Sequence, residues 1–178
     1  MKKYKIFLTG MMGSGKSSLG QNLADKLNTP FIDLDKKIEI KLKKNIDQIF
    51  SEFGEDFFRK EESLVLTDMI AQFSNESEFV CALGGGTIMN GANLDLIKRS
   101  GTLIFIDVNI KELVERLKRG KSNRPLLKNL NEQDLESKLV EIYNKRSDSY
   151  KKAHIIIENN SNNIDFVTDE IKKRLTTC

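Results

Sequence analysis

This sequence of 178 residues has no long apolar run, few cysteines, a single histidine and no large excess of either charge. No stretch approaches the roughly 18 consecutive apolar residues of a membrane-spanning helix, and the apolar centre of the N-terminus, MKKYKIFLTGMM, is too short for a signal peptide. We therefore expect a cytoplasmic protein without a membrane partner. The 29 Lys and Arg residues nearly balance the 26 Asp and Glu residues, so the net charge gives no reason to expect a nucleic-acid partner, and any positive site must be local.

Cysteine and histidine are the rarest of the reactive residues. The two cysteines, Cys81 and Cys178, make neither a disulfide framework nor a metal-ligand cluster, and so few thiols fit a reducing compartment. The only histidine, His154, lies away from every motif described below, and we interpret it as structural. The length and the 39% of hydrophobic residues suffice for one core, so residues 1–178 are expected to form a single domain.

Short apolar runs alternate with stretches of helical spacing. Runs rich in β-formers predict strands at residues 5–8, 31–34, 79–83, 103–108 and 155–157. Apolar stripes predict helices over about 17–27, 131–152 and 164–175. We interpret these stripes as core faces, among them Leu19, Leu23 and Leu27 in the first and Ile164, Val167, Ile171 and Leu175 in the last. Strands that alternate with helices predict an α/β fold with a parallel sheet covered on both faces.

The first predicted strand runs directly into GMMGSGKSS, which contains the P-loop pattern Gly10-x-x-x-x-Gly15-Lys16-Ser17. Glycines let the backbone curl so that its N–H groups face phosphate oxygens, and the following helix adds the positive end of its dipole. Lys16 can reach the β- and γ-phosphates, and the Ser17 hydroxyl can bind magnesium. A turn that merely joins a strand to a helix has no use for this Lys-Ser pair, so the motif predicts binding of a nucleoside triphosphate.

Two pairs of charged residues follow. In PFIDLD, Asp33 and Asp35 are two residues apart, so along an extended strand they share a face and could hold magnesium and a hydroxyl group. Equally, an Asp in this position often only ends a strand and caps a helix. Arg59 and Glu62 are neighbours on a helix; the pair is either a solvated surface contact or a partly buried one in which Glu62 fixes Arg59 for an anion.

Further along the chain, ALGGGT ends a predicted strand with Gly84–Gly86. Consecutive glycines weaken regular structure, so we expect something to approach this backbone closely, such as a ligand at the carboxyl end of a central strand. RGKSNRPLL carries Arg119 and Arg124, and NKRSDSY carries Arg146 and Tyr150. Arginine matches phosphate and carboxylate groups with a planar fork of donors that lysine lacks.

Taken in order, these motifs resemble the shikimate kinase family. The resemblance runs from about Lys5 to Tyr150 and rests on GMMGSGKSS, FIDLD, IFSEFGEDFFRKEE, ALGGGT, RPLL and KRSDSY. It implies transfer of the ATP γ-phosphate to the 3-hydroxyl of shikimate, which gives shikimate 3-phosphate and ADP in chorismate and aromatic amino acid biosynthesis. ATP as co-substrate, Mg²⁺, shikimate as acceptor and a monomeric enzyme are expected with it.

The resemblance also assigns roles to residues. The ATP phosphates would be held by Gly13, Ser14, Gly15, Lys16, Ser17 and Ser18. Magnesium would be bound by Ser17 and, through water, by Asp33. Arg124 would contact the phosphates from a lid over about 119–128, and Arg119 would lie over the adenine. Lys16, Asp35 and Arg124 are the expected catalytic residues.

On the acceptor side, Asp35 would bind the shikimate hydroxyls and orient or deprotonate the attacking one. Arg59 and Arg146 would bind the carboxylate, and the ring would lie against Gly84, Gly85 and Gly86. The fold implied by the resemblance is a five-stranded parallel P-loop kinase sheet of order 2-3-1-4-5, with a mobile lid and an acceptor-binding region over about 33–62.

Two other kinds of protein share the P-loop. The first is a kinase of another hydroxy-acid or of a nucleotide, but the histidine motif of gluconate kinases is missing and neither FIDLD nor the triple glycine is expected in a nucleotide kinase. The second is a non-catalytic ATP-binding module, which would be favoured by loss of an acceptor residue. Asp33, Asp35, Arg59 and Arg146 are all present, so a shikimate kinase is the preferred interpretation.

Overall fold

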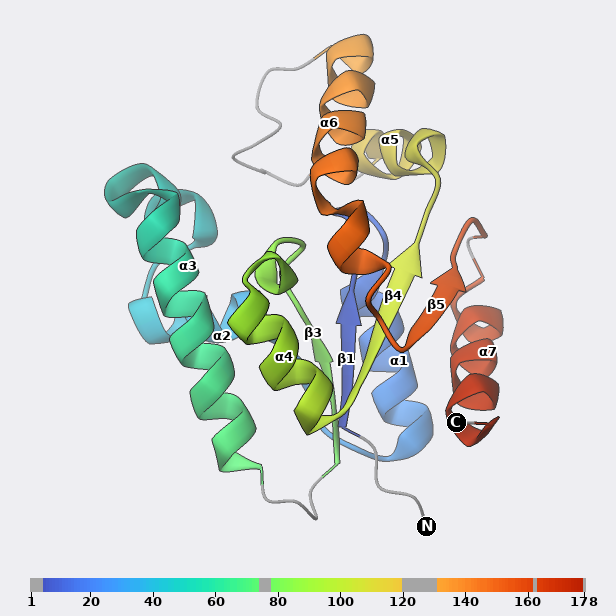
Figure 1. Cartoon of the computed structure of the whole chain (residues 1–178). Coiled ribbons are helices and arrows are strands. Elements are labelled where there is room, and N and C mark those ends of the chain that lie inside the picture. The colour runs from blue at the N-terminus through green and yellow to red at the C-terminus, as the bar shows by residue number, and fades with distance from the viewer. Residues whose placement is uncertain (1–4, 74–77, 120–130, 162, 178) are drawn as a thin grey trace.

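A computed structural model describes residues 5–73, 78–119, 131–161 and 163–177. At its centre lies a five-stranded sheet in the order β2-β3-β1-β4-β5, in which every pair of neighbours is parallel (Figure 1). The expected α/β class and the strand order implied by the resemblance are both confirmed.

The strands begin and end within one residue of their predicted bounds. They are β1 (Lys5–Thr9), β2 (Phe31–Asp33), β3 (Phe79–Ala82), β4 (Thr102–Asp107) and β5 (Ile155–Glu158). The central strands are buried almost throughout, because helices cover both faces, whereas the edge strand β5 alternates buried and exposed residues. His154, just before β5, is structural as expected: its Nδ1 accepts a hydrogen bond from the Leu103 N–H at 3.0 Å.

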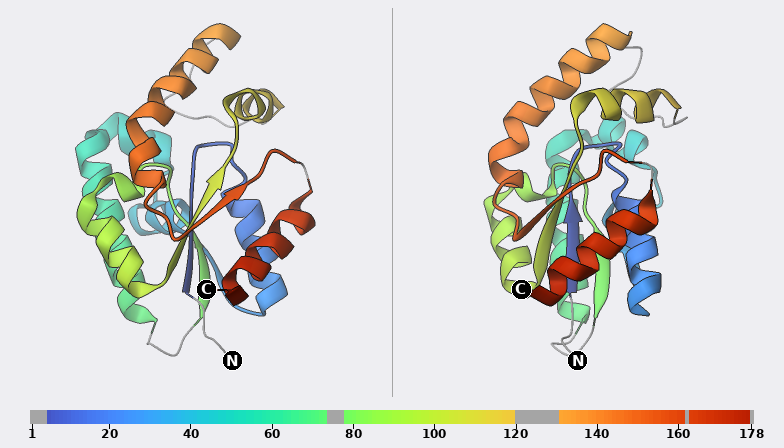
Figure 2. Two further views of the ribbon diagram at one scale, coloured as in Figure 1. Left: turned by 45° about the vertical axis from the view of Figure 1, so that its right-hand side comes forward. Right: turned by 90° about the vertical axis from the view of Figure 1, so that its right-hand side faces the viewer.

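Helices form a layer on each side of the sheet and a group beyond its carboxyl edge. They are α1 (Lys16–Leu27), α2 (Leu34–Leu42), α3 (Ile46–Gln72), α4 (Gly91–Ser100), α5 (Ile110–Arg119), α6 (Glu132–Tyr150) and α7 (Ile164–Thr177). α1 and α7 cover one face and α3 and α4 the other, while α5 and α6 stand beyond the strand ends (Figures 1 and 2). Within the described ranges, none of the helices has the length and apolar character needed to cross a membrane.

The predicted apolar stripes face the core with one exception. Val167, Ile171 and Leu175 of α7 are at most 3% exposed, as are Leu19 and Leu23 of α1. Ile164 is 41% exposed, so its assignment to the core was wrong. As the first residue of α7 it lies at the edge of the packed face.

The long helix α3 is two helices joined at a glycine. Its start is fixed by a capping box, in which the Asn45 side chain accepts from the Gln48 N–H while the Gln48 side chain accepts from the Asn45 N–H. At Gly54 the backbone leaves helical geometry with φ 82° and ψ 174°. α3 therefore changes direction between Phe50 and Arg59, both of which line the cavity described below.

The turn between α4 and β4 has no room for a side chain. An added Cβ on Gly101 would overlap the backbone oxygen of Lys5, whereas one on Gly91, the first residue of α4, would meet nothing within 4 Å. We expect Gly101→Ala to lower the free energy of unfolding by about 1–3 kcal/mol, because the backbone of β1 must shift. Gly91→Ala is the matched control and should leave stability equal or slightly higher. Urea unfolding of both variants tests this, and equal midpoints would contradict it.

Candidate active site

The turn between β1 and α1 is shaped by glycines and closed by a lysine. Gly13 and Gly15 have φ of 81° and 88°, in the left-handed region that glycine favours. The Lys16 ammonium donates hydrogen bonds to the carbonyl oxygens of Gly10 at 3.0 Å and Met11 at 2.9 Å. The turn thus curls around a positive charge at the N-terminus of a helix, an arrangement suited to phosphate binding.

Asp33 connects this turn to β2. Its Oδ2 accepts a hydrogen bond from the Ser17 hydroxyl at 2.8 Å, and its Oδ1 caps α2 by accepting from the Lys36 N–H at 3.2 Å. Capping and contact with the P-loop therefore occur together. The prediction that Asp33 and Asp35 share the face of a strand was wrong, because β2 ends at Asp33 and Asp35 lies in the first turn of α2. Both nevertheless line one cavity.

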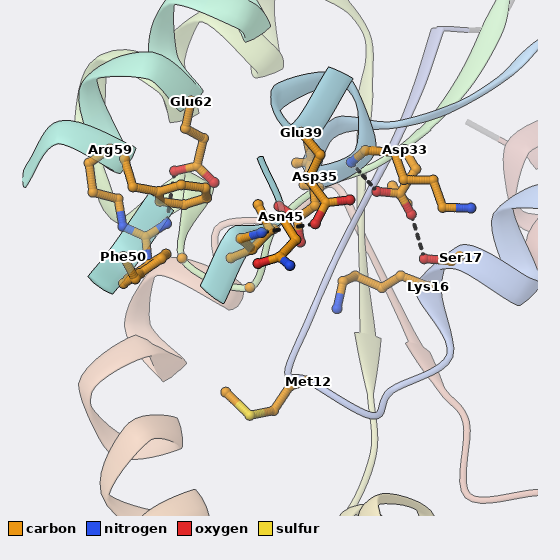
Figure 3. A pocket seen from close by; sticks show the side chains of 18 of the residues that line it. Met12, Lys16, Ser17, Asp33, Asp35, Glu39, Asn45, Phe50, Arg59 and Glu62 are labelled. Carbon is orange, nitrogen blue, oxygen red and sulfur yellow. Dashed lines mark hydrogen bonds and ion pairs between the residues drawn. The ribbon is translucent and has the colours of Figure 1, made fainter. Parts of the chain in front are cut away.

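That cavity, of about 670 Å³, joins the P-loop to α2, α3, the end of β3 and α6. Figure 3 shows Lys16 and Ser17 on one side, Arg59 and Glu62 on the other, and Asp35 between them. Apolar contacts come from Met12, Ile46, Phe50 and Phe58. The lining therefore has a phosphate-binding type of turn on one side and a second group of charged residues on the other side.

The turn after β3 explains its three glycines. At each position an added Cβ would collide with, or press on, a charged side chain of the cavity. The pairs, with the distance from that Cβ, are Gly84 and Glu62 Oε1 (2.7 Å), Gly85 and Arg146 Nη1 (3.1 Å), and Gly86 and Arg59 Nη2 (2.7 Å). The expected close approach to this backbone is thus made by the protein's own charged groups.

Arg59 is held from its buried side. Its Nη1 donates to Glu62 Oε2 at 2.9 Å, and Glu62, only 1% exposed, also accepts from the Thr87 hydroxyl at 2.7 Å. The other edge of the guanidinium, Nε and Nη2, meets Glu55, whose side chain is 57% exposed. Of the two interpretations of the Arg59–Glu62 pair, the partly buried one is correct, and the outer edge of Arg59 is bound to an exposed carboxylate.

Asp35 lies among more negative than positive charge. Its pKa is raised from 3.8 to about 6, first by burial and then by the carboxylates of Glu62 and Asp33, whose effect exceeds the opposite effect of Lys16 and Arg59. Its Oδ1 is buried and has no hydrogen-bond partner among the described residues. A buried carboxylate oxygen without a partner, facing a cavity, is poised to accept a hydrogen bond from a ligand.

One contact to the P-loop was missed by the sequence analysis. Asn159, the residue after β5, donates from Nδ2 to the carbonyl oxygen of the buried Ser14 at 3.0 Å. Arg116 of α5 in turn donates to the carbonyl oxygen of Asn159 at 2.8 Å. The available signal was position, since a residue that follows a parallel strand lies at the same edge of the sheet as the P-loop.

The remaining predicted residues are less central in the structure. Ser18 is exposed on the first turn of α1. Arg119 ends α5, where its side chain is 69% exposed, lies 3.7 Å from Glu115 and does not line the cavity. Arg124, with residues 120–128 of the expected lid, lies outside the described residues.

Comparisons with known proteins agree on one family. A sequence model of the shikimate kinase family matches residues 12–176. A shikimate kinase of Clostridium botulinum is 41% identical over 172 residues, which cover 96% of each chain. The structure of a Bacteroides thetaiotaomicron shikimate kinase has a TM-score of 0.87 at 33% identity and covers 98% of this chain and 97% of its own. That of an Acinetobacter baumannii shikimate kinase in complex with shikimate has a TM-score of 0.89 at 31% identity and covers 99% and 94%.

The raised pKa of Asp35 predicts how stability depends on pH. The folded protein binds this proton more tightly than an exposed carboxyl of pKa 3.8 does, so the favourable contribution is complete below about pH 4 and is lost as pH rises through about 6. Asp35→Asn keeps the neutral form at every pH. We expect it to raise the free energy of unfolding at pH 7.5 by up to about 3 kcal/mol, from about 1.4 kcal/mol per pKa unit, and to change it little at pH 4.

Urea unfolding at the two pH values measures this difference. Asp95→Asn, at an exposed position on α4, is the control for the change in net charge and should behave like the parent at both. An Asp35→Asn variant less stable than the parent at pH 7.5 would show that the ionised carboxylate is well compensated in the folded state.

Proposed function

Because the chain belongs to the shikimate kinase family, whose members use ATP to phosphorylate a hydroxyl of shikimate, we propose that this reaction takes place in the 670 Å³ cavity. One observation carries the proposal. The P-loop, Asp35 and two arginines converge on a single cavity, so a donor phosphate and a carboxylate-bearing acceptor can lie next to each other.

The acceptor end lies at the glycine turn. Arg59 and Arg146 come from α3 and α6 and meet the backbone at Gly86 and Gly85. Shikimate carries one carboxylate, and two guanidinium groups bind such a group with charge-assisted hydrogen bonds. We therefore assign the carboxylate to Arg59 and Arg146 and place the ring against Gly84–Gly86.

Asp35 lies between this end and the P-loop. Its unpartnered Oδ1 is assigned to the hydroxyl that attacks, which donates its hydrogen bond there. In the transfer, the bond between the γ-phosphorus and the bridging oxygen of ATP breaks, a bond from phosphorus to the shikimate oxygen forms, and the hydroxyl proton leaves toward Asp35. Phosphoryl transfer depends mainly on positioning and charge neutralisation, and the fixed place of Asp35 at the start of α2 supplies the positioning.

The donor end lies at the P-loop. Lys16 is assigned to the β- and γ-phosphates, with the backbone of Gly13, Ser14 and Gly15 around them. The Ser17 hydroxyl and the Asp33 carboxylate lie 2.8 Å apart, and both are the hard oxygen donors that Mg²⁺ prefers, so these residues fit a magnesium site. When bound, Mg²⁺ would neutralise charge on the phosphates.

Arg124 is retained as the lid residue that contacts the phosphates, and Arg119 as an adenine contact. In the structure the Arg119 side chain lies next to Glu115 on the same helix. A monomeric state and a cytoplasmic location complete the proposal.

The choice of acceptor is testable directly. We expect ATP and Mg²⁺ to give rapid ADP release with shikimate, and release at the level of the blank with gluconate or AMP, because only shikimate fits both the carboxylate site and the ring site. A coupled assay of ADP release measures all three. Stimulation by AMP above that by shikimate would instead make the chain a nucleotide kinase.

The role of Arg146 predicts an effect on one substrate only. Each charge-assisted hydrogen bond contributes about 1.5–3 kcal/mol, so Arg146→Ala should raise KM for shikimate roughly ten- to hundredfold and leave KM for ATP nearly unchanged. Initial rates against each substrate check this, with Arg99→Ala, on the exposed side of α4, as the control. A larger rise in KM for ATP would remove Arg146 from the acceptor site.

A further inference from the structure

Tyr150 is the last residue of α6 and is fully buried, although it carries a polar group. Its ring is stacked on Phe105 of β4, with centroids 4.7 Å apart and an angle of 11° between the planes. This packing fixes the ring between the sheet and the active-site turns. Because the ring is fixed, the position of the hydroxyl oxygen is fixed as well.

The hydroxyl sits where three parts of the active site meet. It donates a hydrogen bond of 2.6 Å to the carbonyl oxygen of Gly85, and the Arg146 guanidinium, one helical turn earlier on α6, interacts with it at the same glycine: Arg146 Nη1 and the hydroxyl lie 3.1 Å and 3.8 Å from where a Cβ on Gly85 would be. It also lies 3.8 Å from the sulfur of Met11 in the P-loop. Burial raises the pKa of the phenol, so the proton needed for the bond to Gly85 stays in place.

These contacts are directional. A phenol has one proton, which goes to Gly85, and its oxygen lone pairs remain for the guanidinium of Arg146. Arg146 Nη1 in turn lies close to the backbone of Gly85, 3.1 Å from where a Cβ would be. Tyr150 therefore links the guanidinium and the glycine turn through a single oxygen atom.

We propose that Tyr150 is a positioning residue for shikimate binding: its hydroxyl holds the Arg146 guanidinium against the Gly85 backbone, in the orientation that receives the carboxylate. Without that acceptor, Arg146 keeps its charge but gains rotamers in which its donors point away from the ligand. The carboxylate does not change during phosphoryl transfer, so the contribution is to binding and not to the chemical step.

Tyr150→Phe tests the inference because it keeps the ring stacked on Phe105 and removes only the hydroxyl. We expect KM for shikimate to rise about 5- to 30-fold, with kcat and KM for ATP each within about twofold of the parent. Tyr143→Phe is the matched control: it lies two turns earlier on α6, outside the main cavity, and should change neither KM. An unchanged KM for shikimate, a fall in kcat alone, or equal rises in both KM values would overturn the inference.

A double-mutant cycle asks whether Tyr150 acts through Arg146. In the Arg146→Ala background, Tyr150→Phe should raise KM for shikimate by less than twofold, since the group that it positions is gone. If the two effects multiply in full, the proposed route through Arg146 is wrong. Shikimate binding measured by calorimetry at 10 °C gives the same comparison without turnover, should a variant lose stability at assay temperature.

The inference rests on the proposed role of Arg146, and the same cycle separates the two. If Arg146→Ala leaves KM for shikimate unchanged, the assignment of the carboxylate site fails. If Arg146→Ala raises it and Tyr150→Phe does not, the carboxylate site stands and only the positioning role of Tyr150 fails.

Discussion

Three adjacent positions without side chains, Gly84–Gly86, are the constraint on which the candidate active site depends. The turn ends β3, which lies between β2 and β1 in the sheet, so it is next to the P-loop. Because no Cβ stands in the way, Glu62, Arg146 and Arg59 can all touch its backbone. The distance between the phosphate-binding turn and the acceptor groups is therefore set by two strand ends and not by flexible side chains, which favours a fixed geometry for transfer.

Two carboxylates near this turn differ in how many hydrogen-bond and ion-pair partners they have. Glu62 is paired with Arg59 and Thr87, and it serves as a buried support for the guanidinium. Asp35, a few ångströms away, has an oxygen with no partner among the described residues and a pKa raised by burial and by like charge. An unsatisfied carboxylate lowers stability unless a ligand completes it. Natural proteins keep such groups where activity needs them, which agrees with the proposed place of the reacting hydroxyl beside Asp35.

Local signals in the sequence were enough for the sheet and the P-loop. Runs such as KIFLT and TLIFID are strongly apolar and bounded by turn residues, and the glycines, Lys16 and Ser17 form one continuous motif. Asp35 was misplaced on a strand because periodicity cannot show that Asp33 already caps the next helix. Contacts such as Tyr150 with Gly85, or Asn159 with Ser14, join residues 65 and 145 positions apart. These contacts form only when strand ends and helices pack together, so a local sequence pattern does not predict them.

The hydrogen bonds of Lys16 to backbone carbonyl oxygens affect the free energy of ATP binding. In this structure the ammonium binds the carbonyl oxygens of Gly10 and Met11. Phosphate oxygens must compete with these carbonyls, so nucleotide binding is an exchange of partners and not the gain of a new one. The measured free energy of binding is then the difference between two sets of bonds, smaller than the attraction between lysine and phosphate. Weak binding of ATP would consequently be compatible with strong contacts to the bound phosphates.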